Sequence, residues 1–70
     1  MDPGEYIEAA KACALTLVDE GRPNRAVSAF IAELRKHPAT ASIITPDKQA
    51  IGLEAALSGA YYVRAWINSF

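Results

Sequence analysis

Residues 26–38 read AVSAFIAELRKHP, and the fold is decided by this stretch. Its large apolar residues recur at the i, i+3, i+4, i+7 spacing of one helical face: Val27, Phe30, Ile31 and Leu34. The charged residues of the segment fall on other faces, and Pro38 cannot continue a helix. The pattern predicts a central amphipathic helix over residues 23–37, ended by a capping His37, that can pack against neighbours on both sides.

An earlier helix is predicted over residues 3–20. Asp2 can cap its first turn, and Pro3 suits the first helical position. Gly21 is a natural residue to follow a helix end. A stripe at helical spacing predicts the buried face: Ile7, Ala10, Ala14, Leu17 and Val18, with Tyr6 and Cys13 at its edges. Because only a short turn joins this helix to the central one, the two are expected to form an antiparallel αα-hairpin.

Downstream, residues 38–45 carry no helical pattern and are expected to be irregular. Thr45 and Pro46 repeat the capping signal of the first helix, so a third helix is predicted over residues 46–58. Its core-facing stripe is expected to be formed by Ala50, Leu53, Leu57 and Ala60.

Gly59 leaves two interpretations open. A glycine inside a helix costs about 1 kcal/mol relative to alanine, which favours a break and a short fourth helix over residues 60–69. The apolar spacing nevertheless continues in phase past Gly59, which favours one kinked helix from Pro46 to Ser69. The predicted fold is therefore an all-α bundle of three to four helices, in a single domain spanning residues 1–70.

Length and composition point towards self-association. The chain has 70 residues, of which 51% are hydrophobic, and many of these are alanines that bury little area. Cys13 is the only cysteine and His37 the only histidine, so neither an intramolecular disulfide nor a multi-ligand zinc site can form. A second copy of the chain, most simply in a dimer, is the expected source of further buried area.

Charge and hydropathy disfavour several classes of protein. Seven basic residues against eight acidic ones give a net charge of −1, and no basic run marks a nucleic-acid-binding face. The N-terminus lacks the positive region of a signal peptide, and no window approaches ~20 apolar residues. A cytoplasmic protein without membrane association is expected.

Catalytic chemistry finds no support in the residue pattern. Cys13 lies in an alanine-rich helix and is expected to be a buried, inert thiol. His37 is explained by helix termination, and the acidic residues are scattered. We therefore expect no enzyme activity, no catalytic or metal-binding residues and no cofactor.

The last ten residues hold four of the six aromatic side chains of the protein. Tyrosine, tryptophan and arginine dominate protein–protein hot spots. A candidate interaction surface is thus formed by Tyr61, Tyr62, Arg64, Trp66 and Phe70. In the alternative interpretation, Trp66 and Ile67 complete the monomer core and the tyrosines are half-exposed packing.

Two segments of the chain resemble small uncharacterised proteins of actinobacteriophages, mycobacteriophages in particular. The first is residues 26–40, with Ala26-Val27, Ser28, Phe30-Ile31, Glu33-Leu34, Lys36-His37-Pro38 and Thr40. The second contains Val63, Arg64, Trp66, Ile67 and Phe70. The resemblance covers about residues 26–70 and implies an all-helical phage protein in the cytoplasm of an infected host; it implies no activity.

Three functions follow as hypotheses. The first is a non-enzymatic protein that binds a host or phage protein and associates with itself. The second is capture of a small nucleotide, in which Arg64 holds a phosphate beside two stacking tyrosines. The third and weakest is DNA binding by a helix-turn-helix around Gly21, since the helix that follows is nearly neutral.

Overall fold

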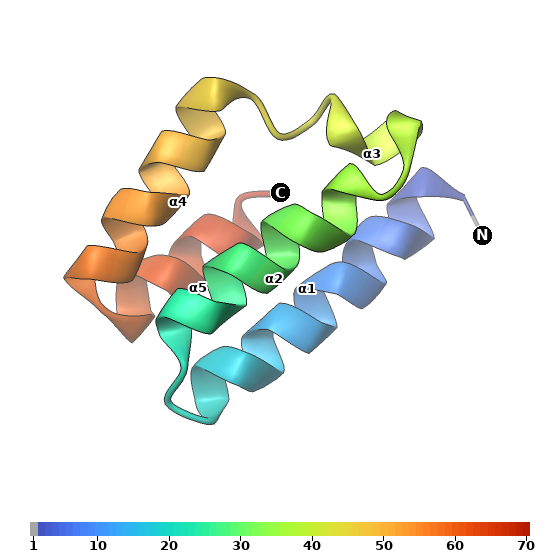
Figure 1. The fold of residues 1–70 in the computed structure, drawn as a ribbon. Helices are drawn as coiled ribbons and strands as arrows, with labels where there is room; N and C mark the ends of the chain where they lie inside the picture. Colours follow the sequence, from blue (N-terminus) through green and yellow to red (C-terminus); the bar gives the residue numbers. More distant parts are fainter. Residues whose placement is uncertain (1) are drawn as a thin grey trace.

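The protein, seen in a computed structural model that describes residues 2–70, folds into helices joined by short connections (Figure 1). In chain order the described residues form five helices: α1 (Pro3–Asp19), α2 (Pro23–Arg35), α3 (Pro38–Ala41), α4 (Pro46–Ser58) and α5 (Ala60–Asn68). The predicted all-helical class is confirmed. The predicted count of three to four helices is wrong, because α3 was not foreseen.

The ends of α1 follow the local signals in the sequence. Asp2 is the N-cap, and its carboxylate accepts a hydrogen bond from the Glu5 amide at 2.9 Å. After α1, Gly21 adopts a φ of +79°, and the amides of Gly21 and Arg22 bond back to the carbonyls of Val18 and Leu17. This is a Schellman turn, and it reverses the chain so that α1 and α2 form the predicted antiparallel hairpin (Figure 1).

The connection after α2 corrects the sequence interpretation. The central helix ends at Arg35 rather than His37, and residues 38–41 form one helical turn rather than an irregular segment. His37 is extended, as a residue before proline prefers to be, and it is the N-cap of α3 rather than the end of α2. Pro38 was interpreted as a helix stop, yet it begins a helix, as the other three prolines do.

Thr40 explains why this turn is present. Its side chain is fully buried, and its hydroxyl donates to the Leu34 carbonyl at 2.5 Å, in the last turn of α2. The final carbonyls of a helix have no partner within the helix, so a buried helix end needs such a donor. The α3 turn thus supplies the cap that closes α2 against the core.

The break between α4 and α5 is real. Gly59 has φ +122° and ψ 177°, a combination that is essentially restricted to glycine. The alternative of one kinked helix is therefore wrong, and the expectation of a separate last helix is confirmed.

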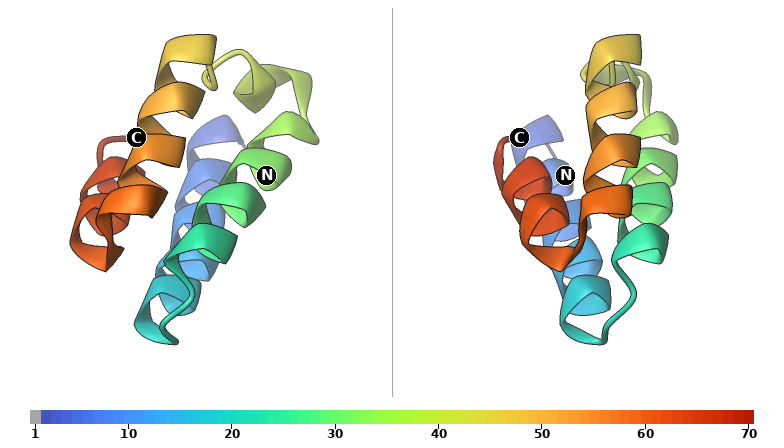
Figure 2. Two further views of the ribbon diagram at one scale, coloured as in Figure 1. Left: turned by 60° about the vertical axis from the view of Figure 1, so that its left-hand side comes forward. Right: turned by 90° about the vertical axis from the view of Figure 1, so that its left-hand side faces the viewer.

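The two C-terminal helices cover different parts of the hairpin. Helix α5 packs against both α1 and α2, whereas α4 packs against α2 and α5 and leaves its other sides uncovered (Figure 2). The face of α2 predicted from residues 26–38 is buried in the centre. The core is completed by side chains from the other helices and from the loop before α4, which include Ala10, Ala14, Val18, Ile44, Ala55, Val63, Trp66 and Ile67.

The face of α4 that meets the core is not the predicted one. Leu53 and Leu57 were expected inside, but 52% of the Leu53 surface and 90% of the Leu57 surface are exposed. The buried positions are Gly52 and Ala55. They face inwards because the indole ring of Trp66 needs the space that a larger residue would fill at position 52.

Candidate functional site

Two residues of the predicted interaction surface pack against the core, and one of them is buried in it. Trp66 is only 5% exposed, and its ring meets Phe30 and Phe70 edge-on at centroid distances of 5.6 and 5.1 Å. Phe70 is half-buried and contacts Phe30 at 5.0 Å. The Trp66 Nε1 group donates to the carbonyl of Lys48 at 3.0 Å, and the Lys48 ammonium lies 4.9 Å from the centre of the Phe70 ring. This cluster joins α2, α4 and α5.

Arg64 has a partner on the hairpin. Its guanidinium lies 3.0 Å from the carboxylate of Asp19, and both side chains are partly exposed. Asp19 is the last residue of α1, where a negative charge is unfavourable to the helix dipole. The contact offsets that charge and ties α5 to the end of α1.

Tyr61 and Tyr62 remain on the surface. They are 78% and 55% exposed, and their rings meet edge-on at 5.4 Å. Together with three exposed residues of α4 they make up what we call the apolar face, which extends round α4 from its α5 side to the opposite side: Ile51, Leu53, Leu57, Tyr61 and Tyr62. The sequence interpretation missed the three aliphatic members, because it assigned Leu53 and Leu57 to a core stripe by their spacing and gave Ile51 no role.

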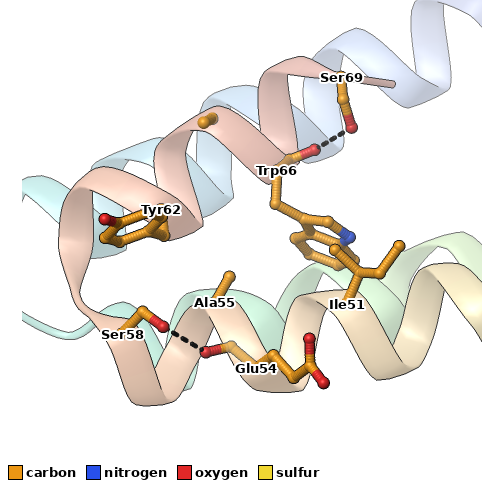
Figure 3. A pocket seen from close by; sticks show the side chains of 8 residues that line it. Ile51, Glu54, Ala55, Ser58, Tyr62, Trp66 and Ser69 are labelled. Atoms are coloured by element: carbon orange, nitrogen blue, oxygen red, sulfur yellow. Dashed lines mark hydrogen bonds between the residues drawn. The ribbon is translucent and has the colours of Figure 1, made fainter.

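A groove runs between α4 and α5, with a volume of about 400 Å³. Figure 3 shows Tyr62 and Trp66 projecting from α5 towards α4, with Ala55 between them and Ile51 beside the indole. Glu54 and Ser58 border the groove from α4, where the Ser58 hydroxyl donates to the Glu54 carbonyl at 3.0 Å (Figure 3). Two residues of the apolar face, Ile51 and Tyr62, therefore border this groove.

On its other side α4 borders a second depression, which we call the α2–α4 hollow. It has a volume of about 290 Å³ and is lined by Arg35, Ile44, Pro46, Gln49, Ala50 and Leu53. The Arg35 guanidinium donates to the side-chain oxygen of Gln49, which joins α2 to α4 along one edge. The ridge of α4 thus has a concave surface on either side.

A polar cluster lies at the open end of the α1–α2 hairpin, away from the turn that joins the two helices. The Tyr6 hydroxyl lies 2.7 Å from the Glu33 carbonyl and 3.1 Å from the Glu33 carboxylate, and Lys36 lies 2.8 Å from that carboxylate. The hydrogen bonds from Lys36 and then Tyr6 lower the pKa of Glu33. Burial, followed by the bond to Glu33, raises the pKa of the Tyr6 phenol. The His37 ring lies 4.4 Å from the Tyr6 ring, so the cluster fastens α1 to the end of α2.

Cys13 does not have the predicted environment. It is exposed on α1 rather than buried, because the face that α1 turns towards its neighbours carries Ala10, Ala14 and Val18. Across residues 2–70, no group of three or more His, Cys, Asp or Glu side chains could hold a metal ion. None of the helices in the same range is long and apolar enough to cross a membrane.

Comparison of the chain with protein-family models, curated proteins and solved structures gives no match.

Proposed function

We propose that this protein is a small protein-binding module whose binding surface is the apolar face of α4 and α5. The observation that carries the proposal is the exposure of five large hydrophobic side chains on adjacent helices, among them Leu57 at 90%. In the setting implied by the sequence resemblance, the partner is a host or phage protein, and a second copy of this chain is one such protein.

The size of the apolar face supports this function. A buried aromatic side chain contributes about 150–250 Å², so five large side chains that are each more than half exposed present on the order of 500 Å². The largest apolar patch of a typical monomer measures about 300–600 Å² and is often functional. Leaving this area in water is unfavourable at about 25 cal/mol per Å², and a partner that covers it removes that cost.

Protein binding also requires fewer side-chain rearrangements than nucleotide capture does. Nucleotide capture by Arg64 requires its guanidinium to leave Asp19, which lies 3.0 Å away. Stacking of a base between the two tyrosines requires them to separate, since their rings are in edge contact. A protein partner needs neither change, because the apolar face is already exposed.

Affinity capture from a lysate of expressing host cells tests the proposal. The bait is the tagged full chain, compared with Leu57→Ser and Tyr61→Ser variants of the apolar face. Cys13→Ser is the matched control because it changes an exposed residue on α1, which has no packing contact with α4. Proteins retained by the wild type and the control but lost by both face variants support the proposal. Equal recovery by all four baits overturns it.

A further inference from the structure

We propose that the apolar face binds a second copy of this chain, with the two α4 helices antiparallel and Leu57 of each copy seated in the α2–α4 hollow of the other. This inference rests on the proposed function, because it names the partner of the same surface. It is carried by the arrangement of a protruding side chain and a depression along one helix.

The exposed stripe of α4 has the character of a buried seam. Ala50, Leu53 and Leu57 are separated by three and four residues, the spacing with which packed helices meet. None of them is charged, although Glu54 lies beside Ala50 and Leu57 on the side of the stripe that borders the α4–α5 groove. The stripe was predicted to face the core for these reasons. Since the core is filled without it, a surface outside the monomer is the remaining place where it can be buried.

The same face carries a projection and a receptor for it. Leu57 projects near the end of α4, and the α2–α4 hollow lies along the first half of the helix beside Ala50. A cavity of about 150 Å³ holds a molecule the size of benzene, so a hollow of about 290 Å³ can take a leucine side chain. A two-fold interface brings one surface onto itself, and it therefore requires projection and receptor on the same surface.

The antiparallel orientation follows from the positions of these features. With a two-fold axis between positions 53 and 54, Leu57 of one copy lies opposite Ala50 of the other, and the two Leu53 side chains lie beside the axis. Leu57 then faces a small residue, while Leu53 lies opposite Glu54 of the other copy at the centre of the pair. In a parallel pair, Leu57 would meet its own equivalent and Ala50 would meet alanine, so the helices would be forced apart at one end and leave a gap at the other.

The area is sufficient for a weak dimer. Ile51 and Tyr62 border the groove on the other side of α4, so each copy buries at most the ~500 Å² of the whole apolar face. Two copies bury at most about 1,000 Å² in total, which is the range of weak and transient contacts. An interface of this size is expected to dissociate in the micromolar range or above.

The first measurement is mass in solution by analytical ultracentrifugation across roughly 10–500 µM, which brackets that range. Wild type is expected to shift from monomer to dimer. Leu57→Asp should raise the dimer dissociation constant at least ~100-fold, because two leucines lose their burial at once. Ala12→Asp adds the same charge to an exposed position of α1 and should leave the dimer unchanged. Circular dichroism verifies that both variants fold.

Disulfide trapping tests the orientation, using chains in which Cys13 is replaced by serine. A mixture of Ala50→Cys and Leu57→Cys chains should form a crosslinked heterodimer. Ala50→Cys alone, which keeps Leu57 in both copies, should not crosslink, since the two positions 50 lie about 10 Å apart along the axis, beyond the ~7 Å that a disulfide spans. Crosslinking of Ala50→Cys alone, without the mixed product, indicates a parallel pair and overturns the inference.

The remaining outcomes separate this inference from the proposed function. A wild-type chain that stays monomeric throughout, or a dimer that survives Leu57→Asp, overturns the inference. The proposed function is judged by the capture experiment, where a partner lost by the face variants would sustain it even for a monomer.

Discussion

The indole ring of Trp66 occupies the space that a side chain at position 52 would need: a β-carbon built on Gly52 would lie 2.5 Å from the Trp66 Cζ2 atom. This contact decides which face of α4 is buried. It brings α4 close enough for the Trp66 Nε1 group to reach the Lys48 carbonyl at 3.0 Å. As a consequence Leu53 and Leu57, which the sequence pattern assigned to the core, face outwards.

Replacement of Gly52 by alanine should therefore destabilise the protein, although alanine is the better helix former by about 1 kcal/mol. The added methyl group forces the indole out of its site, and overpacking of this kind costs about 1–3 kcal/mol. Urea denaturation of Gly52→Ala measures the change. In a Trp66→Phe background the smaller ring leaves room, so the same replacement should be neutral or stabilising. An equal loss in both backgrounds would contradict the contact.

The helix starts could be predicted from the sequence because local chemistry determines them. Asp2 and Thr45 cap their helices with the side-chain bonds expected of these residue types, and Gly21 takes the positive φ that follows a helix. The burial of α2 was equally predictable, since one stripe accounts for all its large apolar residues. These features need no knowledge of what packs against them.

The orientation of α4 could not be predicted because it depends on a residue fourteen positions away. Leucine spacing on α4 favours one buried face, whereas the size of Trp66 demands glycine and alanine on another, and tertiary packing prevails. The same contact divides the predicted interaction surface, with Trp66 buried inside and Tyr61 exposed. The signal in the sequence is the pair of small residues Gly52 and Ala55, which leave room for the indole on one face of α4.

Thr40→Val should cost about 1–3 kcal/mol of folding free energy. Valine keeps the shape of the side chain but removes the hydroxyl that caps the Leu34 carbonyl, so a buried acceptor loses its partner. Thr16→Val is the matched control, because the Thr16 hydroxyl bonds the Ala12 carbonyl on an exposed helix face. That change should stay within about 0.5 kcal/mol. Thermal unfolding of both variants provides the comparison, and equal losses would contradict a special role for Thr40.

Gly59→Ala should destabilise the protein by about 1–3 kcal/mol, because the φ of +122° and ψ of 177° at this position are strained for any residue with a β-carbon. Nothing lies within 4 Å of the position where that carbon would be placed, so the effect comes from the backbone alone. Gly21→Asn is the control. The φ of +79° at Gly21 lies near the left-handed region that asparagine tolerates, and only a small loss is expected. If Gly59→Ala proved as mild as the control, the backbone break between α4 and α5 would be in question.

The Tyr6–Glu33–Lys36 cluster should make stability depend on pH at both extremes. The pKa of Glu33 is lowered, so its contribution is present above the pKa of the unfolded chain and is lost as the pH falls through the folded value. The pKa of Tyr6 is raised, so its contribution is present below the unfolded value and is lost as the pH rises through the folded one.

Carboxyl-carbon NMR titration separates the two partners of Glu33. Lys36→Gln should raise the Glu33 midpoint most, since the bond from Lys36 is the main cause of its lowered pKa. Tyr6→Phe should raise that midpoint by less and should also abolish the alkaline loss of stability that Tyr6 causes. Because the ring of Tyr6 is retained as phenylalanine, its contact with His37 persists, and the change reports the hydroxyl alone. A Glu33 midpoint that stays fixed in both variants would mean that the carboxylate points to solvent. The hairpin would then be fastened at this end by ring contacts and by the Tyr6 hydrogen bond to the Glu33 carbonyl.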